Sequence, residues 1–212
     1  MPRRIIRYAI ALIALFLVGY NSIYFKKLSE VKAASPATEF DAKEYAQQFW
    51  NNVLIPRLPA AIDILELTKQ LNENPQRAFQ DHSHALGIGN IRYFLVKGKG
   101  TVKFVNENDV SVLIDSGSQQ LSMRMATEFV YGNAVRDAVG TLDLNDFTNT
   151  MDLNNVSAEI NRKIRQEVIP HFLTNVQKGM VVQFAGAVEL NQKFLDLEDI
   201  EIIPVSVTIV QQ

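Results

Sequence analysis

The chain of 212 residues has no cysteine, only three histidines and a single tryptophan. The absence of cysteine excludes disulfides, thiolate metal ligands, a cysteine nucleophile and lipid attachment to a cysteine within this sequence. The three histidines leave few bases for a hydrolytic triad, and no serine lies in a nucleophile-elbow motif. We therefore expect a protein that is not an enzyme, and nothing in the sequence predicts a cofactor.

The larger part of the chain also lacks an excess of positive charge. Residues 1–40 contain six Lys or Arg and two Asp or Glu, whereas the remaining residues contain 15 Lys or Arg and 21 Asp or Glu. Affinity for nucleic acid is dominated by neutralisation of phosphates, and an anionic membrane surface attracts basic segments. The acidic balance of the larger part therefore argues against nucleic acid as a partner.

Long apolar runs are confined to the N-terminus. Arg3, Arg4 and Arg7 precede an apolar segment of 18 residues, 8–25. At about 1.5 Å per residue, this segment just spans a hydrocarbon core of about 30 Å, and the arginines favour the cytoplasmic side. We therefore predict that residues 1–32 form a single-pass anchor in a bacterial inner membrane, with the C-terminal domain in the periplasm.

A cleaved signal peptide is the competing interpretation of the same segment. Val31–Ala34 offers a cleavage site with small residues. However, four charged residues lie between the apolar run and this site or within the site itself. Cleavage sites rarely tolerate such charges, so an uncleaved anchor is favoured and cleavage stays open. Residues 33–40 then have the composition of a linker.

Helical periodicity predicts a helical segment over residues 41–86. Asp41 and Glu44 form a capping box at its start. Phe49 and Trp50 lie on the apolar face of the first helix, which predicts packing in the core. The alternative for these two aromatic side chains is a platform that stacks on a sugar.

Prolines divide the remaining helical pattern. Pro56 is expected, together with Pro59, to break the first helix. A second helix is predicted for about residues 60–72 and a third for about 75–82. Much later in the chain, Pro170 is expected to bend or end another helix.

The hydrophobic period changes from 3.6 to 2 at about residue 87. It predicts strands over residues 92–105, 110–114, 121–125, 180–190 and 200–210. Gly98 and Gly100 suggest a bend in the first strand, and Pro204 implies that the last strand has an edge position or a bulge. With a helix over 155–169, this order predicts an α+β fold with an OB-like five-stranded β-barrel in residues 87–212. A β-sandwich with a helical cap is the alternative.

A polar insertion over residues 129–155 lies beside the predicted helix. Between residues 131 and 161 the chain has six Asn, four Asp and one Arg. Arg136 and Asp137 either bind a ligand or tie the insertion down, and as neighbours on a strand or loop they need not pair with each other. Gly132 is expected to supply a positive φ or close packing. Asn155, or its neighbour Asn154, is expected to cap the helix that follows.

The binding interpretation selects four residues of this insertion. It takes Asn133, Arg136, Asp137 and Asn149 as ligand-binding residues for a small polar ligand such as a carbohydrate, because planar amide, guanidinium and carboxylate groups fork onto adjacent hydroxyls. It predicts a concave pocket lined by these side chains. A hydrolase, the third alternative, would instead require a nucleophile and a base within hydrogen-bond distance.

Two sequence patterns have residues that could bind a metal ion. The carboxylates and amides from Asp143 onward suggest calcium, but the glycine and the final glutamate of an EF-hand loop are missing. His82-Ser83-His84 offers two ligands, and His171 or a carboxylate would have to supply a third. Turns, helix caps and exposed histidines explain both patterns, so no metal is predicted.

Six segments together resemble one bacterial family, that of predicted periplasmic lipoproteins of unknown function. They are Tyr20–Lys27, Phe49-Trp50 with Pro56, Val96–Val102, Gly132–Ala138, Asp146–Asn149 and Asn155-Val156. The resemblance covers most of residues 20–190 and implies no known catalytic activity. Members are often encoded beside sugar ABC-transporter components, which implies a transporter or another envelope protein as a partner. Lipoprotein members have a cysteine after the apolar run and this chain does not, so the expectation is a protein anchor and an accessory or binding role.

Overall fold

The computed structural model describes residues 5, 8, 12–13, 16–17 and 40–210. The chain divides into two units, Met1–Phe40 and Asp41–Gln212. In the first unit, residues 5, 8, 12–13 and 16–17 are helical and Phe40 is in neither a helix nor a strand. The rest of the predicted membrane segment 8–25 lies outside the described residues, as does nearly all of the predicted linker. Among the described residues, no helix is both long enough and apolar enough to cross a membrane.

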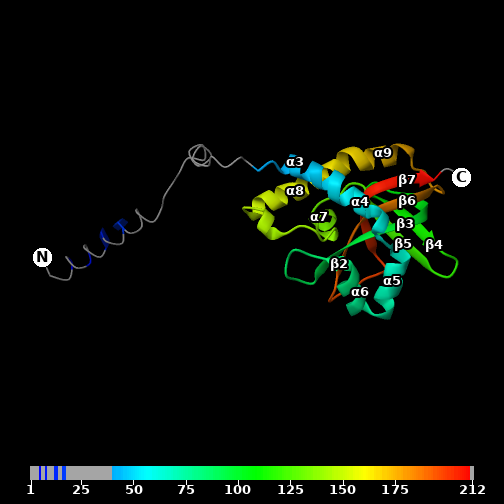
Figure 1. The fold of residues 1–212 in the computed structure, drawn as a ribbon, viewed down its shortest axis with the longest axis horizontal. Helices are drawn as coiled ribbons and strands as arrows, with labels where there is room; N and C mark the ends of the chain where they lie inside the picture. Colours follow the sequence, from blue (N-terminus) through cyan, green and yellow to red (C-terminus); the bar gives the residue numbers. More distant parts are fainter. Residues whose placement is uncertain (1–4, 6–7, 9–11, 14–15, 18–39, 211–212) are drawn as a thin grey trace. The chain divides into compact units, whose positions relative to one another are not determined.

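Five strands of the second unit form a closed barrel (Figure 1). The strands are β3 (Ile91–Val105), β4 (Asp109–Asp115), β5 (Gln120–Ala126), β6 (Val181–Asn191) and β7 (Ile200–Val210). Their order around the barrel is β3-β4-β5-β7-β6, and β6 pairs back onto β3. The β5–β7 pair is parallel, and the other barrel pairs are antiparallel. The predicted OB-like barrel is confirmed, and the alternative of a sandwich is wrong.

Strand β3 changes its partner along its length. Residues 91–101 pair with β6, whereas residues 101–105 pair with β4, with a register shift between Val102 and Phe104. A Cβ at Gly98 would lie 2.7 Å from the ring of Phe184, and one at Gly100 would lie 2.6 Å from Val112. The two glycines therefore allow close approach of neighbouring strands where the sheet curves.

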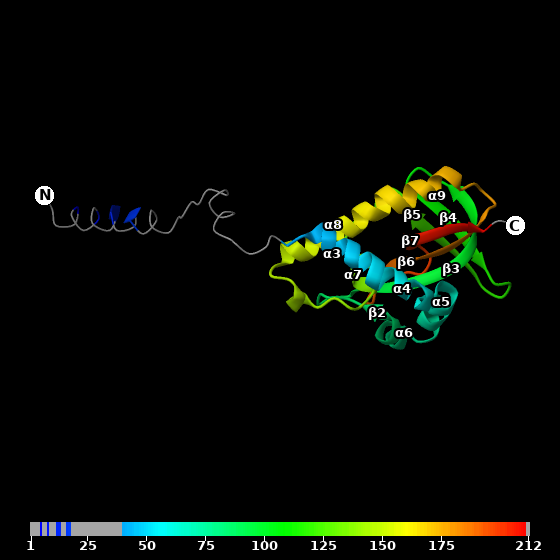
Figure 2. The ribbon, with the colours of Figure 1, turned by 45° about the horizontal axis from the view of Figure 1, so that its top comes forward.

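Alternate residues of the five strands fill the barrel, as period-2 patterning requires. Among the most buried are Phe94, Val112, Met125, Phe184 and Ile202. The barrel core continues into helices α5 (Ile64–Glu73) and α6 (Pro75–His82) and into α9 (Ile169–Asn175). In Figures 1 and 2 these lie on opposite sides of the barrel, with α9 above and α5 and α6 below.

Two short strands join the helical segment to the barrel. Strand β1 (Ile62–Asp63) and strand β2 (Ser83–His84) both pair with β3, β1 in parallel and β2 antiparallel. The prediction of helices alone for residues 41–86 missed them. A strand of two residues is too short to show a periodic pattern in the sequence. These two strands form only because β3 offers backbone N–H and C=O groups with which they can pair.

The first helix does not end at Pro56. Helix α3 (Ala42–Phe49), capped by Asp41 as predicted, continues through a π-helical turn (Trp50–Leu54) into α4 (Ile55–Arg57), and only a 3₁₀ turn (Leu58–Ala60) ends it. The predicted break at Pro56 is therefore wrong. Phe49 and Trp50 are buried, as the core interpretation expects.

The helix after the polar insertion also departs from its predicted bounds. It begins as α8 (Thr150–Lys163), not at residue 155, and passes through a π-helical turn (Ile164–Val168) into α9. Pro170 does not end it. The insertion itself contains helix α7 (Ala134–Ala138) and a 3₁₀ turn (Leu144–Asp146), which the sequence pattern did not predict.

Both helices continue through a proline by means of a π-helical turn. The N–H of Ile55 donates to the carbonyl of Trp50, and the N–H of Ile169 donates to the carbonyl of Ile164. Each bond spans five residues and stands immediately before a proline. A wider π turn gives room for the proline ring, which would otherwise clash with the carbonyl four residues earlier.

The β6–β7 pair requires a glycine at position 186. Gly186 pairs with Pro204 at a register shift, which confirms the predicted bulge, and a Cβ there would overlap the carbonyl oxygen of Ile203. Because this backbone cannot move away inside a closed barrel, Gly186→Ala should destabilise the protein by about 1–3 kcal/mol in chemical unfolding.

Gly87→Ala is the matched control for this substitution. A Cβ at Gly87 meets nothing within 4 Å, so this change should shift the free energy of unfolding by about 0.5 kcal/mol or less. Equal unfolding midpoints for the two variants would contradict the close approach at Gly186.

Candidate functional site

A hollow of about 410 Å³ lies beside the polar insertion, and we call it the main hollow. The loop that follows β2 forms one wall, and α7 with the start of α8 forms the other. Its lining residues with polar side chains are Tyr93, Asn133, Arg136, Asp137, Thr150 and Asn154. Its apolar walls come mainly from the loop 85–91 and from Leu144 and Leu153.

The entry to α7 is held by α8. Gly132 has a φ of 76°, which confirms the expected positive value. Its carbonyl accepts a hydrogen bond of 2.9 Å from Nδ2 of the buried Asn161, and Asn133 Oδ1 accepts one of 3.2 Å from Ser157 Oγ. These contacts orient α7 so that all five of its residues are buried.

Arg136 and Asp137 form a buried ion pair. Arg136 Nε donates to Asp137 Oδ1 at 2.6 Å, and the two side chains are 3% and 4% exposed. The expected strand or loop is wrong, because Arg136 and Asp137 lie in a turn of helix. Adjacent side chains there stand about 100° apart, and these two pair. Arg136 Nη1 also donates to the carbonyl of Leu153 at 3.2 Å and to Ser157 Oγ at 2.8 Å. The arginine therefore ties α7 to α8.

The pair does not use all of its hydrogen-bonding capacity. Among the described residues, no hydrogen bond reaches Nη2 of Arg136 or Oδ2 of Asp137. Both side chains line the main hollow. A guanidinium nitrogen and a carboxylate oxygen are thus held by the fold at the wall of a hollow.

Tyr93 adds an aromatic hydroxyl from the sheet. The strand register places His84, Tyr93 and Glu189 side by side on β2, β3 and β6. Burial raises the pKa of Tyr93, and the charges of Glu189 and Asp137 raise it further, so its hydroxyl keeps its proton. Burial also raises the pKa of Glu189.

Two of the predicted site residues have other positions. Asn149 caps α8, because its Oδ1 accepts from the N–H of Asp152 at 2.9 Å, and it does not line the main hollow. Asn155, predicted as the cap, lies inside the helix and is exposed. The cap lies six residues earlier because Leu153 already belongs to the buried stripe of α8. Of the four predicted ligand-binding residues, the structure brings Asn133, Arg136 and Asp137 together.

Sequence reasoning missed the other half of the hollow. The loop 85–91 and Tyr93 come from a segment interpreted only as a helix end and a strand start. Gly87 and Gly89 flank Ile88, which is fully exposed. Glycines on both sides of an exposed apolar residue are the one local pattern that could have drawn attention to this loop.

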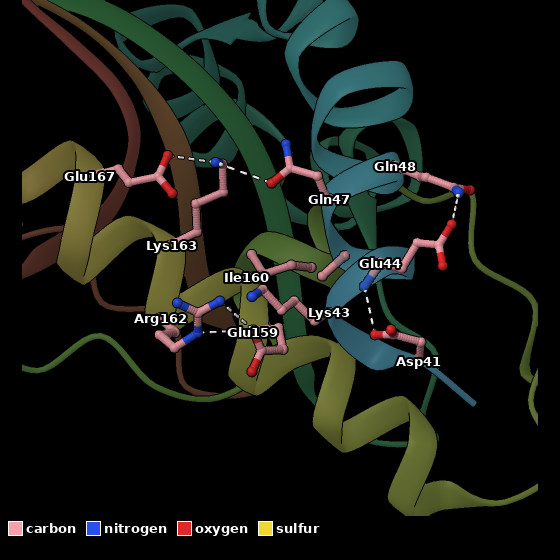
Figure 3. A pocket seen from close by; sticks show the side chains of 11 residues that line it. Asp41, Lys43, Glu44, Gln47, Gln48, Glu159, Ile160, Arg162, Lys163 and Glu167 are labelled. Carbon is pink, nitrogen blue, oxygen red and sulfur yellow. Dashed lines mark hydrogen bonds and ion pairs between the residues drawn. The ribbon is translucent and has the colours of Figure 1, made fainter. Parts of the chain in front are cut away.

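A larger groove, of about 680 Å³, lies between α3 and α8 (Figure 3). Its charged side chains mostly pair with one another: Arg162 Nη2 contacts Glu159 at 2.6 Å and Lys163 Nζ contacts Glu167 at 2.5 Å. Figure 3 shows these side chains joined along α8 and, through Gln47, to α3. The groove is therefore a helix–helix contact with paired charges, and we do not take it as the candidate site.

The residues considered for metal binding are dispersed. His82 Nε2 lies 2.8 Å from Gln70 Oε1, whereas His84 lines a different hollow from His82. Asp143 accepts hydrogen bonds from the backbone and the side chain of Asn145, as an Asx-turn does. In the part of the chain that the structure describes, no group of three or more His, Asp or Glu could hold a metal ion.

A family model described as predicted periplasmic lipoprotein (DUF2291) matches residues 13–208. The chain belongs to this family. The match spans the barrel, the polar insertion and the helices around them, so the main hollow is a feature of the DUF2291 part of the chain. The comparison with curated proteins gave no match.

The barrel of this DUF2291 member is similar to a solved OB-fold structure. A crystal structure of an OB-fold protein from Thermotoga maritima is 24% identical, with a TM-score of 0.73, and the match covers 82% of this chain and 100% of that chain. This likeness establishes the fold alone. The Stn1–Ten1 complex of S. pombe is 11% identical over 58% of this chain and 67% of that chain, with a TM-score of 0.27 that carries no functional argument.

The buried pair should make a large contribution to stability. Arg136→Met leaves the Asp137 carboxylate buried without its partner, and removing one member of a buried pair costs about 3–5 kcal/mol. Arg124→Met is the control, because Arg124 contacts Asp199 and Glu201 at the surface, with its side chain 40% exposed. The control should cost about 0–1 kcal/mol in urea unfolding. Similar costs for the two variants would show that Arg136 is not a structural tie.

Glu189 should make stability depend on pH. Its pKa is raised in the folded protein, so its ionised form disfavours folding at neutral pH. Glu189→Gln should raise the thermal midpoint at pH 7, and this gain should vanish once the pH is low enough to protonate the glutamate in both states. Glu107→Gln, in an exposed turn, is the control. A gain that is equal at pH 7 and pH 4 would show that ionisation of Glu189 is not the cause.

Proposed function

We propose that the protein is an extracytoplasmic binding protein that holds a small polyhydroxy ligand in the main hollow. The observation that carries the proposal is the buried Arg136–Asp137 pair at the wall of the hollow, with one nitrogen and one oxygen free of partners among the described residues. These atoms offer a donor and an acceptor from two neighbouring residues, a combination that suits two adjacent hydroxyls.

The size and chemistry of the hollow support this proposal. Its volume of about 410 Å³ falls in the range of small-molecule sites, about 300–1,000 Å³, in which apolar walls surround a few polar groups that fix orientation. Tyr93 contributes a ring and a hydroxyl, and Asn133 and Asn154 contribute amides. Because Arg136 and Asp137 neutralise each other, the polar wall suits an uncharged hydroxylated group.

Binding is favoured over hydrolysis by the state of the nearby hydroxyl. Ser157 Oγ accepts from Arg136 and donates to Asn133 Oδ1, so its proton is not directed at a base. An activated serine nucleophile needs a general base as its hydrogen-bond acceptor. The proposal is therefore a non-enzymatic role.

The proposal includes attachment to the inner membrane through residues 8–25. It rests on the three arginines that precede the apolar segment and on the periplasmic description of the family. A component of a sugar transporter, or another envelope protein, is the proposed partner, and the family resemblance of the sequence is its only support. This resemblance is also the reason to begin the ligand search with sugars.

The test is thermal unfolding of the full chain in detergent with neutral monosaccharides and sugar alcohols. A ligand at 100 times its Kd should stabilise the protein by about 2.7 kcal/mol. Tyr93→Phe and Asn154→Ala each remove one polar group from the hollow and should weaken binding by roughly threefold to tenfold. Neither change removes a hydrogen bond found among the described residues, so folding should be preserved.

Gln48→Ala, in the groove between α3 and α8, is the matched control and should leave the Kd unchanged. A ligand that binds equally well to Tyr93→Phe and Asn154→Ala, or that is lost in Gln48→Ala, would place the site elsewhere. No stabilisation by any compound of this class would overturn the proposed function.

A further inference from the structure

A second hollow, of about 180 Å³, adjoins the main one, and we call it the minor hollow. The two share Ala85, Leu86, Arg136 and Asp137. The minor hollow adds His84, Arg92, Gly140 and Leu142 to its lining. The buried ion pair therefore stands between two connected spaces with different chemistry.

Arg92 is held in place by a buried serine. Its Nε donates to Ser83 Oγ at 2.9 Å and its Nη2 donates to the Ser83 carbonyl at 3.2 Å. Ser83 is 4% exposed, and its hydroxyl donates in turn to the carbonyl of Phe79 at 2.5 Å. Within the described residues Arg92 has no carboxylate partner. It is therefore an oriented cation whose Nη1 has no partner there.

The imidazole ring of His84 packs against the backbone of Gly140. Gly140 has a φ of 69°, and a Cβ on it would overlap the His84 ring. Only glycine therefore lets the imidazole lie against this turn. No hydrogen bond to the His84 ring is found in the described part of the chain, so neither ring nitrogen has a hydrogen-bond partner there.

The charge around the minor hollow is positive. The charged groups that line it with His84 are Arg92 from β3 and Arg136 and Asp137 from α7. Asp137 is already paired with Arg136, which leaves Arg92 unbalanced. Burial, and then the charge of Arg92, lower the pKa of His84. A small hollow with an unbalanced guanidinium and free imidazole nitrogens favours a negatively charged occupant.

We propose that the minor hollow is a subsite for an anionic group, a carboxylate or a phosphate monoester, bound by Arg92 and His84. This inference rests on the proposed function and deepens it: the ligand is an acidic polyhydroxy compound, with its hydroxyls in the main hollow and its anionic group in the minor one. Arg92 supplies the charge, and His84 supplies a donor that becomes cationic when an anion arrives.

The three histidines provide a direct test by NMR of their imidazole groups. The full chain in detergent is titrated with pH in the absence and presence of inorganic phosphate and, separately, of acetate. An anion beside His84 favours its protonated form, so phosphate or acetate should raise the pKa of His84. His82 and His171, which do not line the minor hollow, report any general effect of added salt.

Two substitutions of Arg92 keep the test sharp. Arg92→Gln removes the positive charge, so it should abolish the rise in the pKa of His84 or raise the apparent Kd for the anion at least roughly tenfold. Arg92→Lys keeps the positive charge, so it should retain part of the rise in the pKa of His84. Gln48→Ala, whose side chain lines neither hollow, should leave the response unchanged. Comparison of phosphate with acetate distinguishes the two anionic groups.

The outcomes separate this inference from the proposed function. A response of His84 alone that depends on Arg92 supports the anionic subsite, even if no neutral sugar binds. Equal responses of all three histidines, or none at His84 with either anion, overturn the subsite. In that case binding of a neutral sugar that is sensitive to Tyr93→Phe still supports the proposed function, and absence of such binding overturns both.

Discussion

Closure of the barrel through strand β3 is the constraint on which the rest of the structure depends. This one strand pairs with β6 along its first part and with β4 along its second, and it also receives β1 and β2. Without the β3–β6 pairing the sheet would have two open edges, with unpaired N–H and C=O groups. The same strand carries Tyr93 and Arg92, which line the main and the minor hollow together with Arg136 and Asp137 of α7.

The polar insertion is held in place by one charged pair that is satisfied inside the protein. Arg136 makes three hydrogen bonds, to Asp137, Leu153 and Ser157. Burying an ion pair costs desolvation, and the pair is favourable only where geometry and further hydrogen bonds are good. Arg136 and Asp137 also line both hollows, so the structural and the binding interpretations of Arg136 are compatible.

Both long helices pass a proline by the same means, and this shapes the surroundings of the barrel. The π turns before Pro56 and Pro170 let each helix continue where a sequence pattern predicts an end. Continuation of α8 into α9 brings Phe172 into the barrel core, while the start of α8 forms a wall of the main hollow. One continuous helical path thus joins the core to the candidate site.

The sequence by itself determined the barrel. Alternation of apolar residues set the five strands, and the glycines and Pro204 marked where strands approach closely or bulge, because these effects are local in the chain. It also indicated Gly132, Asn133, Arg136 and Asp137 as a group. The pairing of Arg136 with Asp137 depends on the helical conformation of α7. A helix of five residues is too short to be predicted from hydrophobic periodicity.

Only the tertiary structure decided what faces this group. The loop 85–91, Tyr93, His84 and Arg92 lie some 40 to 50 positions earlier in the chain, and the pairing of β2 with β3 and of β3 with β6 brings them to α7. The cap of α8 moved to Asn149 for a similar reason, since burial of Leu153 against the rest of the fold extended the helix. Contacts between distant segments leave no periodic signal in one sequence, because they depend on how whole elements pack and not on the order of neighbouring residues.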